Sequence, residues 1–188
     1  MLQLKNKKGD VLYEADVDTW EGHVFPNELD FEGLYVEDDI SFRDATFEGG
    51  VRFDHAVFKG DVRFSNTTFK RVAWFGHATF KNAVTFDRAV FKGSTYFTNT
   101  TFKGAVYFTN SRFEINAWLN YATFKNHVSF LKTLFNGWSS FSGTTFEKVV
   151  FSEARFNQSH YGFPYVILPA LDGSDLTISG VNYVTVEE

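Results

Sequence analysis

The chain has 188 residues, of which 44% are hydrophobic, and a formal net charge of −5 at pH 7. This length supports one domain with a sizeable core. Cysteine is absent, which excludes a disulfide framework and thiol chemistry and fits a cytoplasmic location. No apolar run has the length of a signal peptide core or a membrane span, so we expect no membrane association.

Residues 1–24 form the first predicted unit, an N-terminal cap. Leu2 and Leu4 alternate with polar residues, residues 6–9 have the composition of a turn, and residues 11–13 favour a return strand. We therefore expect a hairpin, followed by a short irregular or helical stretch over residues 18–24. Its expected role is to cover the open end of the unit that follows, because an uncovered strand edge favours aggregation.

The second predicted unit, residues 25–158, repeats a bulky apolar residue every five or six positions. The series has 25 such positions from Phe25 to Phe156, and 23 of them are Phe. From Phe42 on, the residue two before each Phe of the series is small or β-branched, and positions i−2 and i share one face of a strand. A helix would spread the same residues around its axis. Each repeat therefore predicts a very short strand with one small and one large side chain pointing inward.

Such strands bury their apolar faces only when they wind into a solenoid in which each coil covers the next. The outward residues recur at 22 positions rather than 11, in two rows. One is a threonine row of Thr79, Thr101, Thr123 and Thr145, and the other is an aromatic row of Trp74, Tyr96 and Trp118. A period of 22 residues in four strands predicts a four-sided coil, and the repeat is long enough for about six coils.

The corners between the strands carry glycine and asparagine. Two residues after alternate members of the series stand Gly49, Gly60, Asn82, Gly93, Gly104, Asn126 and Gly137, with Arg71 and Ile115 as exceptions. Glycine and asparagine tolerate positive φ in tight turns. We therefore expect positive φ at these seven positions.

The repeat motif itself resembles a known family. The run Ala-Thr-Phe-Lys-x-x-Val-x-Phe, as in Ala122 to Phe130, is similar to the motif of the pentapeptide repeat proteins, and the resemblance covers about 70% of the chain. It implies an all-β fold, a right-handed quadrilateral parallel β-helix. The familiar family unit centres on Leu with Asp or Asn before it, whereas this chain centres on Phe and adds a residue at alternate corners.

Residues 159–188 form the third predicted unit, a C-terminal β tail. Three β segments are expected, separated by Pro169, residues 172–173 and Gly180. The tail is either a second cap or a dimer contact. Members of the family that the chain resembles often pair through their C-terminal ends, which favours a homodimer contact through Tyr165, Val166, Ile167 and Leu168.

Charge is distributed unevenly along the chain. Residues 1–65 hold 15 acidic and 7 basic side chains, whereas residues 66–156 hold 4 acidic and 11 basic ones. The rod should therefore have an acidic end and a basic middle. This polarity would steer a charged partner over long range, or it would serve only to keep the solenoid surface soluble.

Few residues suggest chemistry. His55 and His77 lie 22 positions apart at equivalent corners, with Asp54 nearby, but the next positions of that series are Asn99 and Tyr121. Two imidazoles without further ligands make a poor metal site. The spacing of the residues predicts no catalytic triad of serine, histidine and an acid, and the sequence has no phosphate-binding loop motif. We predict no enzyme, no metal and no cofactor.

The aromatic row is the main candidate for binding a partner. Exposed large aromatic residues are typical of interfaces, and we add Tyr107, expected one side away, to Trp74, Tyr96 and Trp118. Mutual stacking that stabilises the rod is the alternative interpretation of the row. The leading functional hypothesis is a non-catalytic module that binds another protein or itself.

The resemblance implies a second hypothesis. Some family members present an acidic β-helical surface to type II topoisomerases such as gyrase and thereby mimic DNA. The basic middle of this chain, from Lys59 to Lys125, argues against that role. The lysines themselves would suit a nucleic-acid partner, but the net charge is negative and the aromatic residues lie on another side, so we do not expect one.

Overall fold

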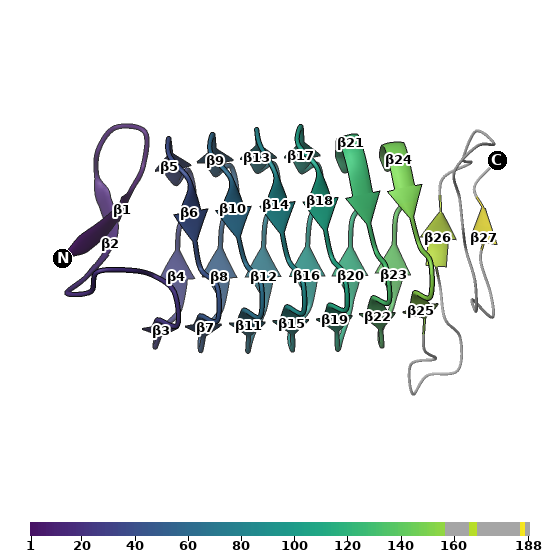
Figure 1. The fold of residues 1–188 in the computed structure, drawn as a ribbon, viewed down its shortest axis with the longest axis horizontal. Coiled ribbons are helices and arrows are strands. Elements are labelled where there is room, and N and C mark those ends of the chain that lie inside the picture. The colour runs from purple at the N-terminus through teal and green to yellow at the C-terminus, as the bar shows by residue number, and fades with distance from the viewer. Residues whose placement is uncertain (157–165, 169–184, 187–188) are drawn as a thin grey trace.

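The computed structural model describes residues 1–156, 166–168 and 185–186. Short parallel strands wind into a four-sided rod, in which strands paired on one face are 22 residues apart, as in the pair Thr79↔Thr101. Figure 1 shows the coils side by side along the long axis. The prediction of an all-β, four-sided parallel solenoid with about six coils of 22 residues is confirmed.

We number the four faces of the rod in chain order. The strands of face 1 are β3 (Val24–Phe25), β7 (Thr46–Phe47), β11 (Thr68–Phe69), β15 (Val90–Phe91), β19 (Arg112–Phe113), β22 (Leu134–Phe135) and β25 (Arg155–Phe156). The strands of face 2 are β4 (Leu29–Asp30), β8 (Val51–Arg52), β12 (Ala73–Trp74), β16 (Thr95–Tyr96), β20 (Ala117–Trp118), β23 (Ser139–Ser140), β26 (Val166–Leu168) and β27 (Thr185–Val186).

Faces 3 and 4 complete each coil. The strands of face 3 are β5 (Tyr35–Val36), β9 (Val57–Phe58), β13 (Thr79–Phe80) and β17 (Thr101–Phe102), and those of face 4 are β6 (Ile40–Ser41), β10 (Val62–Arg63), β14 (Val84–Thr85) and β18 (Val106–Tyr107). Two longer strands, β21 (Thr123–Ser129) and β24 (Thr145–Val150), run over the corner from face 3 to face 4. Their register shifts after Phe124, where the repeat becomes one residue shorter.

The core is a set of stacked phenylalanine rings. Every repeat Phe from Phe25 to Phe141 is at most 2% exposed. Along face 1 the rings of Phe47, Phe69 and Phe91 stack in parallel, with centroids 5.0 and 4.8 Å apart. These distances match the spacing of neighbouring β-strands, so strand pairing and ring stacking share one repeat. The inward assignment of the Phe series is confirmed.

The glycine corners differ from the prediction of positive φ. Positive φ lies at the other corners, and φ there is between 55° and 59° at Asp44, His55, Asn66, His77, Arg88, Asn99, Asn110, Tyr121, Lys132 and Glu153. None of the seven glycines and asparagines predicted to have positive φ shows it. The prediction for those seven positions is therefore wrong.

Close approach between coils explains these glycines instead. A Cβ atom on Gly93 would lie 2.3 Å from the carbonyl carbon of Arg71, and one on Gly104 would lie 2.3 Å from that of Asn82. Gly49, Gly60 and Gly137 meet the backbone of the preceding coil in the same way. Along each of these corners glycine alternates with a larger residue, so only every second coil requires it.

An N-terminal hairpin covers the first coil. Strands β1 (Leu2–Lys5) and β2 (Val11–Ala15) pair in antiparallel, and the residues between β2 and β3 form turns and bends, without a helix. Trp20 is buried, and the Tyr13 ring lies 5.1 Å from the ring of Phe25 at the start of the phenylalanine stack. The hairpin therefore shields the apolar end of the core from water.

Candidate interaction surface

The aromatic row lies on three neighbouring strands of face 2. β12 pairs with β16, which pairs with β20, and the registers Trp74↔Tyr96 and Tyr96↔Trp118 place the three side chains in one line along the rod. All three are partly exposed. They point outward because each precedes an inward Phe or Leu by one position in its strand. The spacing of 22 residues therefore predicted their alignment correctly.

The row is stacked over only part of its length. The rings of Trp74 and Tyr96 are nearly parallel, with an interplanar angle of 10° and centroids 6.4 Å apart. Trp74 also packs over Gly50, where a Cβ atom would lie 3.2 Å from the indole ring. Trp118 has no ring partner among the residues that the structure describes. Mutual stacking thus accounts for Trp74 and Tyr96 but leaves the position of Trp118 unexplained.

Three further apolar residues flank face 2 near Trp118. Ile115 and Trp138 lie at the corner that precedes the face, and Tyr121 lies at the corner that follows it; they are 47%, 42% and 62% exposed. The Tyr121 ring rests on Gly143 of the next coil. A Cβ atom added at Gly143 would lie 2.4 Å from Cδ1 of Tyr121. Sequence reasoning did not include Ile115 or Tyr121 in the candidate surface, although both interrupt corner series that are otherwise largely polar or glycine.

The N-terminal end of the same face is charged. Arg52 lies on β8, in register with Trp74 at the N-terminal end of the aromatic row. Its guanidinium is 3.1 Å from Asp54, 3.2 Å from Glu32 and 3.8 Å from Asp30. The hydrogen bond to Asp54 is the largest of the effects that raise the pKa of Arg52. Three carboxylates surround one guanidinium, so this end of face 2 keeps an excess of negative charge.

Tyr107 does not join the row. It lies on β18 of face 4, two faces away from face 2, rather than one side away as predicted. The error came from counting sides without fixing which strands oppose each other. Its ring is 6.1 Å from that of His127, and its neighbours along the face are Thr85 and Ser129.

The C-terminal candidate lies in the same sheet as the aromatic row. Val166, Ile167 and Leu168 form β26, which pairs in parallel with β23 and thereby extends face 2 beyond β20. Tyr165 lies outside the described residues. Because β23 separates β26 from Trp118, the two regions predicted to bind partners are close neighbours on one face, although the sequence separates them by almost 50 residues.

The histidine pair has the arrangement that its spacing predicts. The rings of His55 and His77 stack with centroids 4.9 Å apart and an interplanar angle of 5°. No group of three or more His, Asp or Glu side chains able to hold a metal ion occurs within the described part of the chain. No helix in that part has the length and hydropathy of a membrane span.

Comparison with known proteins identifies the repeat. The family model described as Pentapeptide repeats (9 copies) matches residues 31–79, 42–90, 75–123 and 86–134, which together cover more than half of the chain. The chain belongs to the pentapeptide repeat family. The family match rests on the repeat, which accounts for the rod. It does not account for the outward residues of face 2, which are not part of the repeat motif. No curated protein matches the chain in sequence.

Two solved proteins are similar to the chain at low sequence identity. The chain is similar to HetL, a pentapeptide repeat protein involved in heterocyst differentiation regulation from the cyanobacterium Nostoc sp. strain PCC 7120, with 16% identity, a TM-score of 0.27 and 87% of each chain covered. It is also similar to QnrB1, a plasmid-mediated fluoroquinolone resistance protein, with 13% identity, a TM-score of 0.34 and 88% and 91% of the two chains covered.

Proposed function

We propose that this pentapeptide repeat protein is a non-catalytic binding module that holds a partner protein along face 2. The observation that carries the proposal is the line of Trp74, Tyr96 and Trp118, three partly exposed aromatic side chains on consecutive strands. Aromatic residues are enriched at interfaces because they contribute a large contact area and lose few rotamers on binding. Trp118, which no ring covers within the described residues, is the expected centre of the contact.

The charges on face 2 define the chemistry of the partner. The acidic excess around Arg52 lies at one end of the row, and the apolar residues Ile115, Tyr121 and Trp138 lie near the other. A complementary partner presents an apolar or aromatic stretch next to Lys or Arg side chains, in an orientation fixed by this polarity. The stacked core makes the face rigid, so little ordering entropy is lost on the side of the rod.

A selection with defined probes tests this proposal. Random peptides displayed on phage are selected against the wild-type chain, and the binding of enriched peptides is measured by fluorescence anisotropy. Enriched sequences should combine aromatic or aliphatic residues with Lys or Arg. Replacing Trp74, Tyr96 and Trp118 by Thr should abolish their binding, whereas Tyr107→Thr, the same kind of change on face 4, should leave it intact. Equal binding to the triple variant would contradict the proposal.

Mimicry of DNA toward a type II topoisomerase is the second candidate. Glu37, Asp38 and Asp39 are all exposed at the corner between β5 and β6, which supports it. The exposed Lys81, Lys103 and Lys125 on the following coils oppose it, because a duplex mimic needs negative charge along its length. A gyrase supercoiling assay decides: protection or inhibition that is lost when the three acids become amides would favour mimicry over peptide binding.

Self-association and a cytoplasmic location complete the proposal. The proposed homodimer contact includes Tyr165, Val166, Ile167 and Leu168. The last three form β26, which extends face 2, so their part of the contact would lie beside the aromatic row. Light scattering on the full chain and on a truncation after residue 156 separates a dimer held by the tail from one held by the row. The lack of cysteine is compatible with a reducing compartment such as the cytoplasm, the location that we propose.

A further inference from the structure

A shallow hollow of about 380 Å³ lies on face 4, at the corner where the chain turns into face 1. Its lining comes from neighbouring coils. Arg63 pairs in register with Thr85, and both residues line the hollow. The hollow is on the side of the rod opposite the aromatic row.

Three guanidinium groups from successive coils line the hollow: those of Arg43, Arg63 and Arg88. Arg43 pairs through Nε with its neighbour Asp44 at 3.2 Å, which leaves its terminal nitrogens available. Arg63 Nη2 forms ion pairs with Asp39 and Asp61, at 3.7 and 3.8 Å, which are too long for hydrogen bonds. The side chain of Arg88 has no hydrogen bond or ion pair with any residue that the structure describes. The N–H groups of these arginines that make no hydrogen bond suit a phosphate group, which guanidinium binds through paired hydrogen bonds.

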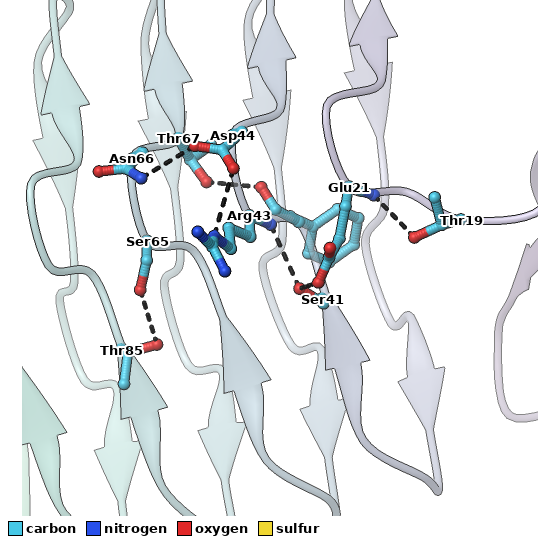
Figure 2. Close-up of polar contacts among 10 residues, drawn as sticks. Thr19, Glu21, Ser41, Arg43, Asp44, Ser65, Asn66, Thr67 and Thr85 are labelled. Carbon is cyan, nitrogen blue, oxygen red and sulfur yellow. Dashed lines mark hydrogen bonds and ion pairs between the residues drawn. The ribbon is translucent and has the colours of Figure 1, made fainter.

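The lining of the hollow also carries the hydroxyl groups of Ser65 and Thr85. The hydroxyl of Ser65 donates a hydrogen bond to Oγ1 of Thr85 at 3.2 Å. Figure 2 shows these two residues on neighbouring coils, with the side chain of Arg43 beside them. In this pair the Thr85 oxygen is the acceptor, so its own proton remains available to a ligand oxygen.

One acidic residue, Asp87, shares the hollow with the three arginines. Its Oδ1 accepts a hydrogen bond from the backbone N–H of Thr109 at 3.0 Å. Burial is the largest influence on this carboxyl and raises the pKa of Asp87, against the opposing effect of the bonds from Thr109. A carboxylate accepts about four hydrogen bonds, so positions remain for donors on a ligand. A bare anion would be repelled by Asp87, whereas an anion with adjacent hydroxyl groups would satisfy it.

We propose that this hollow binds a small phosphate monoester of a polyol or sugar. The phosphate group takes hydrogen bonds from the guanidiniums of Arg43, Arg63 and Arg88 and from the Thr85 hydroxyl. A hydroxyl group of the same ligand donates to the carboxylate of Asp87. The site is independent of the proposed protein contact on face 2 and would stand if that contact were disproved.

Titration of the full-length, isotope-labelled chain by NMR tests the proposal with three probes: glucose 6-phosphate, inorganic phosphate and glucose. Glucose 6-phosphate should give saturable shifts at the amides of residues 85–88 and 109–110, bind about tenfold more tightly than phosphate, and compete with it. Glucose alone should give none. Shifts that fail to saturate, or that show no preference for the sugar phosphate, would mean an adventitious ion only and would overturn the assignment.

Variants with matched charge locate the site. Arg63→Gln and Arg88→Gln should each weaken glucose 6-phosphate binding about tenfold or more, because each removes a charged hydrogen-bond donor. Arg71→Gln removes the same charge at the corner between faces 1 and 2 and should change nothing. If all three variants behave alike, the attraction is only the general charge of the rod, and the site does not exist.

Asp87→Asn tests the second half of the site. Asparagine keeps an oxygen that accepts from Thr109 but has no negative charge. Binding of inorganic phosphate should strengthen and the preference for glucose 6-phosphate should fall. An unchanged preference would show that Asp87 does not receive the ligand hydroxyl. A spectrum that retains the wild-type dispersion confirms that each variant is folded.

Discussion

The glycines at the corners between faces 1 and 2 and between faces 3 and 4 make a sharp stability prediction. At Gly93 the backbone does not have positive φ, and the atoms nearest to an added Cβ are backbone atoms of Arg71 and Val72, at 2.3 to 2.6 Å. Backbone cannot rotate away as a side chain can. An added methyl group must therefore push two coils apart at a place where strand hydrogen bonds and ring stacking hold them together.

The magnitude follows from two opposing terms. Overpacking costs typically about 1–3 kcal/mol, while replacing glycine by alanine stiffens the unfolded chain and gains about 0.4–1 kcal/mol. We expect Gly93→Ala to lower the free energy of unfolding by about 1–2 kcal/mol. Gly33→Ala should cost a similar amount for another reason, since Gly33 has φ of +70° and nothing within 4 Å of the added Cβ.

Asparagine distinguishes the two causes. Asn tolerates positive φ, so Gly33→Asn should recover most of the loss seen with alanine. Gly93→Asn should recover none, because its Cβ meets the same backbone atoms. The measurement is the midpoint of guanidinium chloride unfolding by circular dichroism, since repeat proteins depart from two-state behaviour. A Gly93→Asn midpoint near that of the wild type would refute the close-approach argument and restore the turn interpretation.

Three further predictions concern the core, the coil and the cap. Phe97→Ala should cost about 3–5 kcal/mol in the same melts, because the ring is fully buried, whereas Thr101→Ala on the outside should cost less than about 1 kcal/mol. Deleting residues 78–99 removes one coil and should leave a folded, shorter rod, with a β-sheet spectrum by circular dichroism. Deleting residues 78–88 should disrupt the fold, because it joins face 2 directly to face 1 and omits faces 3 and 4 from that coil. Burial lowers the pKa of His23, so the folded chain binds a proton at this imidazole less readily than the unfolded chain does. The contribution of His23 to the free energy of unfolding should therefore be fully present above about pH 6.5 and should be lost as the pH falls below it. A His23→Gln variant should lose this part of the pH dependence in the same melts.

The inward positions could be predicted from sequence because one requirement recurs in every coil. Each Phe must stack on the Phe one coil earlier, so burial, strand direction and the 22-residue period all follow from its spacing. The corners were harder, because two different requirements favour glycine. Close approach explains Gly93, whereas positive φ is carried by residues such as Asn66, Asn99 and Asn110. These asparagines were the available signal for the second kind of corner.

The candidate site was predicted less completely because core packing does not constrain the outward positions, so their residues need not follow the repeat. The row of Trp74, Tyr96 and Trp118 could be found because it happens to recur at the coil period. The placement of Tyr107 on the opposite face required the order of the strands, which spacing alone did not settle. The hollow on face 4 combines unlike residues from neighbouring coils, and no periodic signal marks it.

The last prediction concerns coupling between the two opposite faces. The core between faces 2 and 4 consists of fully buried rings that stack from coil to coil, as Phe75 does on Phe97 and Phe86 does on Phe108. A close-packed interior of this kind offers few alternative arrangements that could transmit a change. Sites without shared partners and well separated in space usually act additively, to within about 0.3–0.5 kcal/mol. Replacing Trp74, Tyr96 and Trp118 by Thr should therefore change the dissociation constant of glucose 6-phosphate at the hollow by no more than about twofold. The NMR titration, repeated on that variant, measures it. A larger change would mean that the two faces are coupled through the core, either by a second arrangement of its packing or by a change in its dynamics.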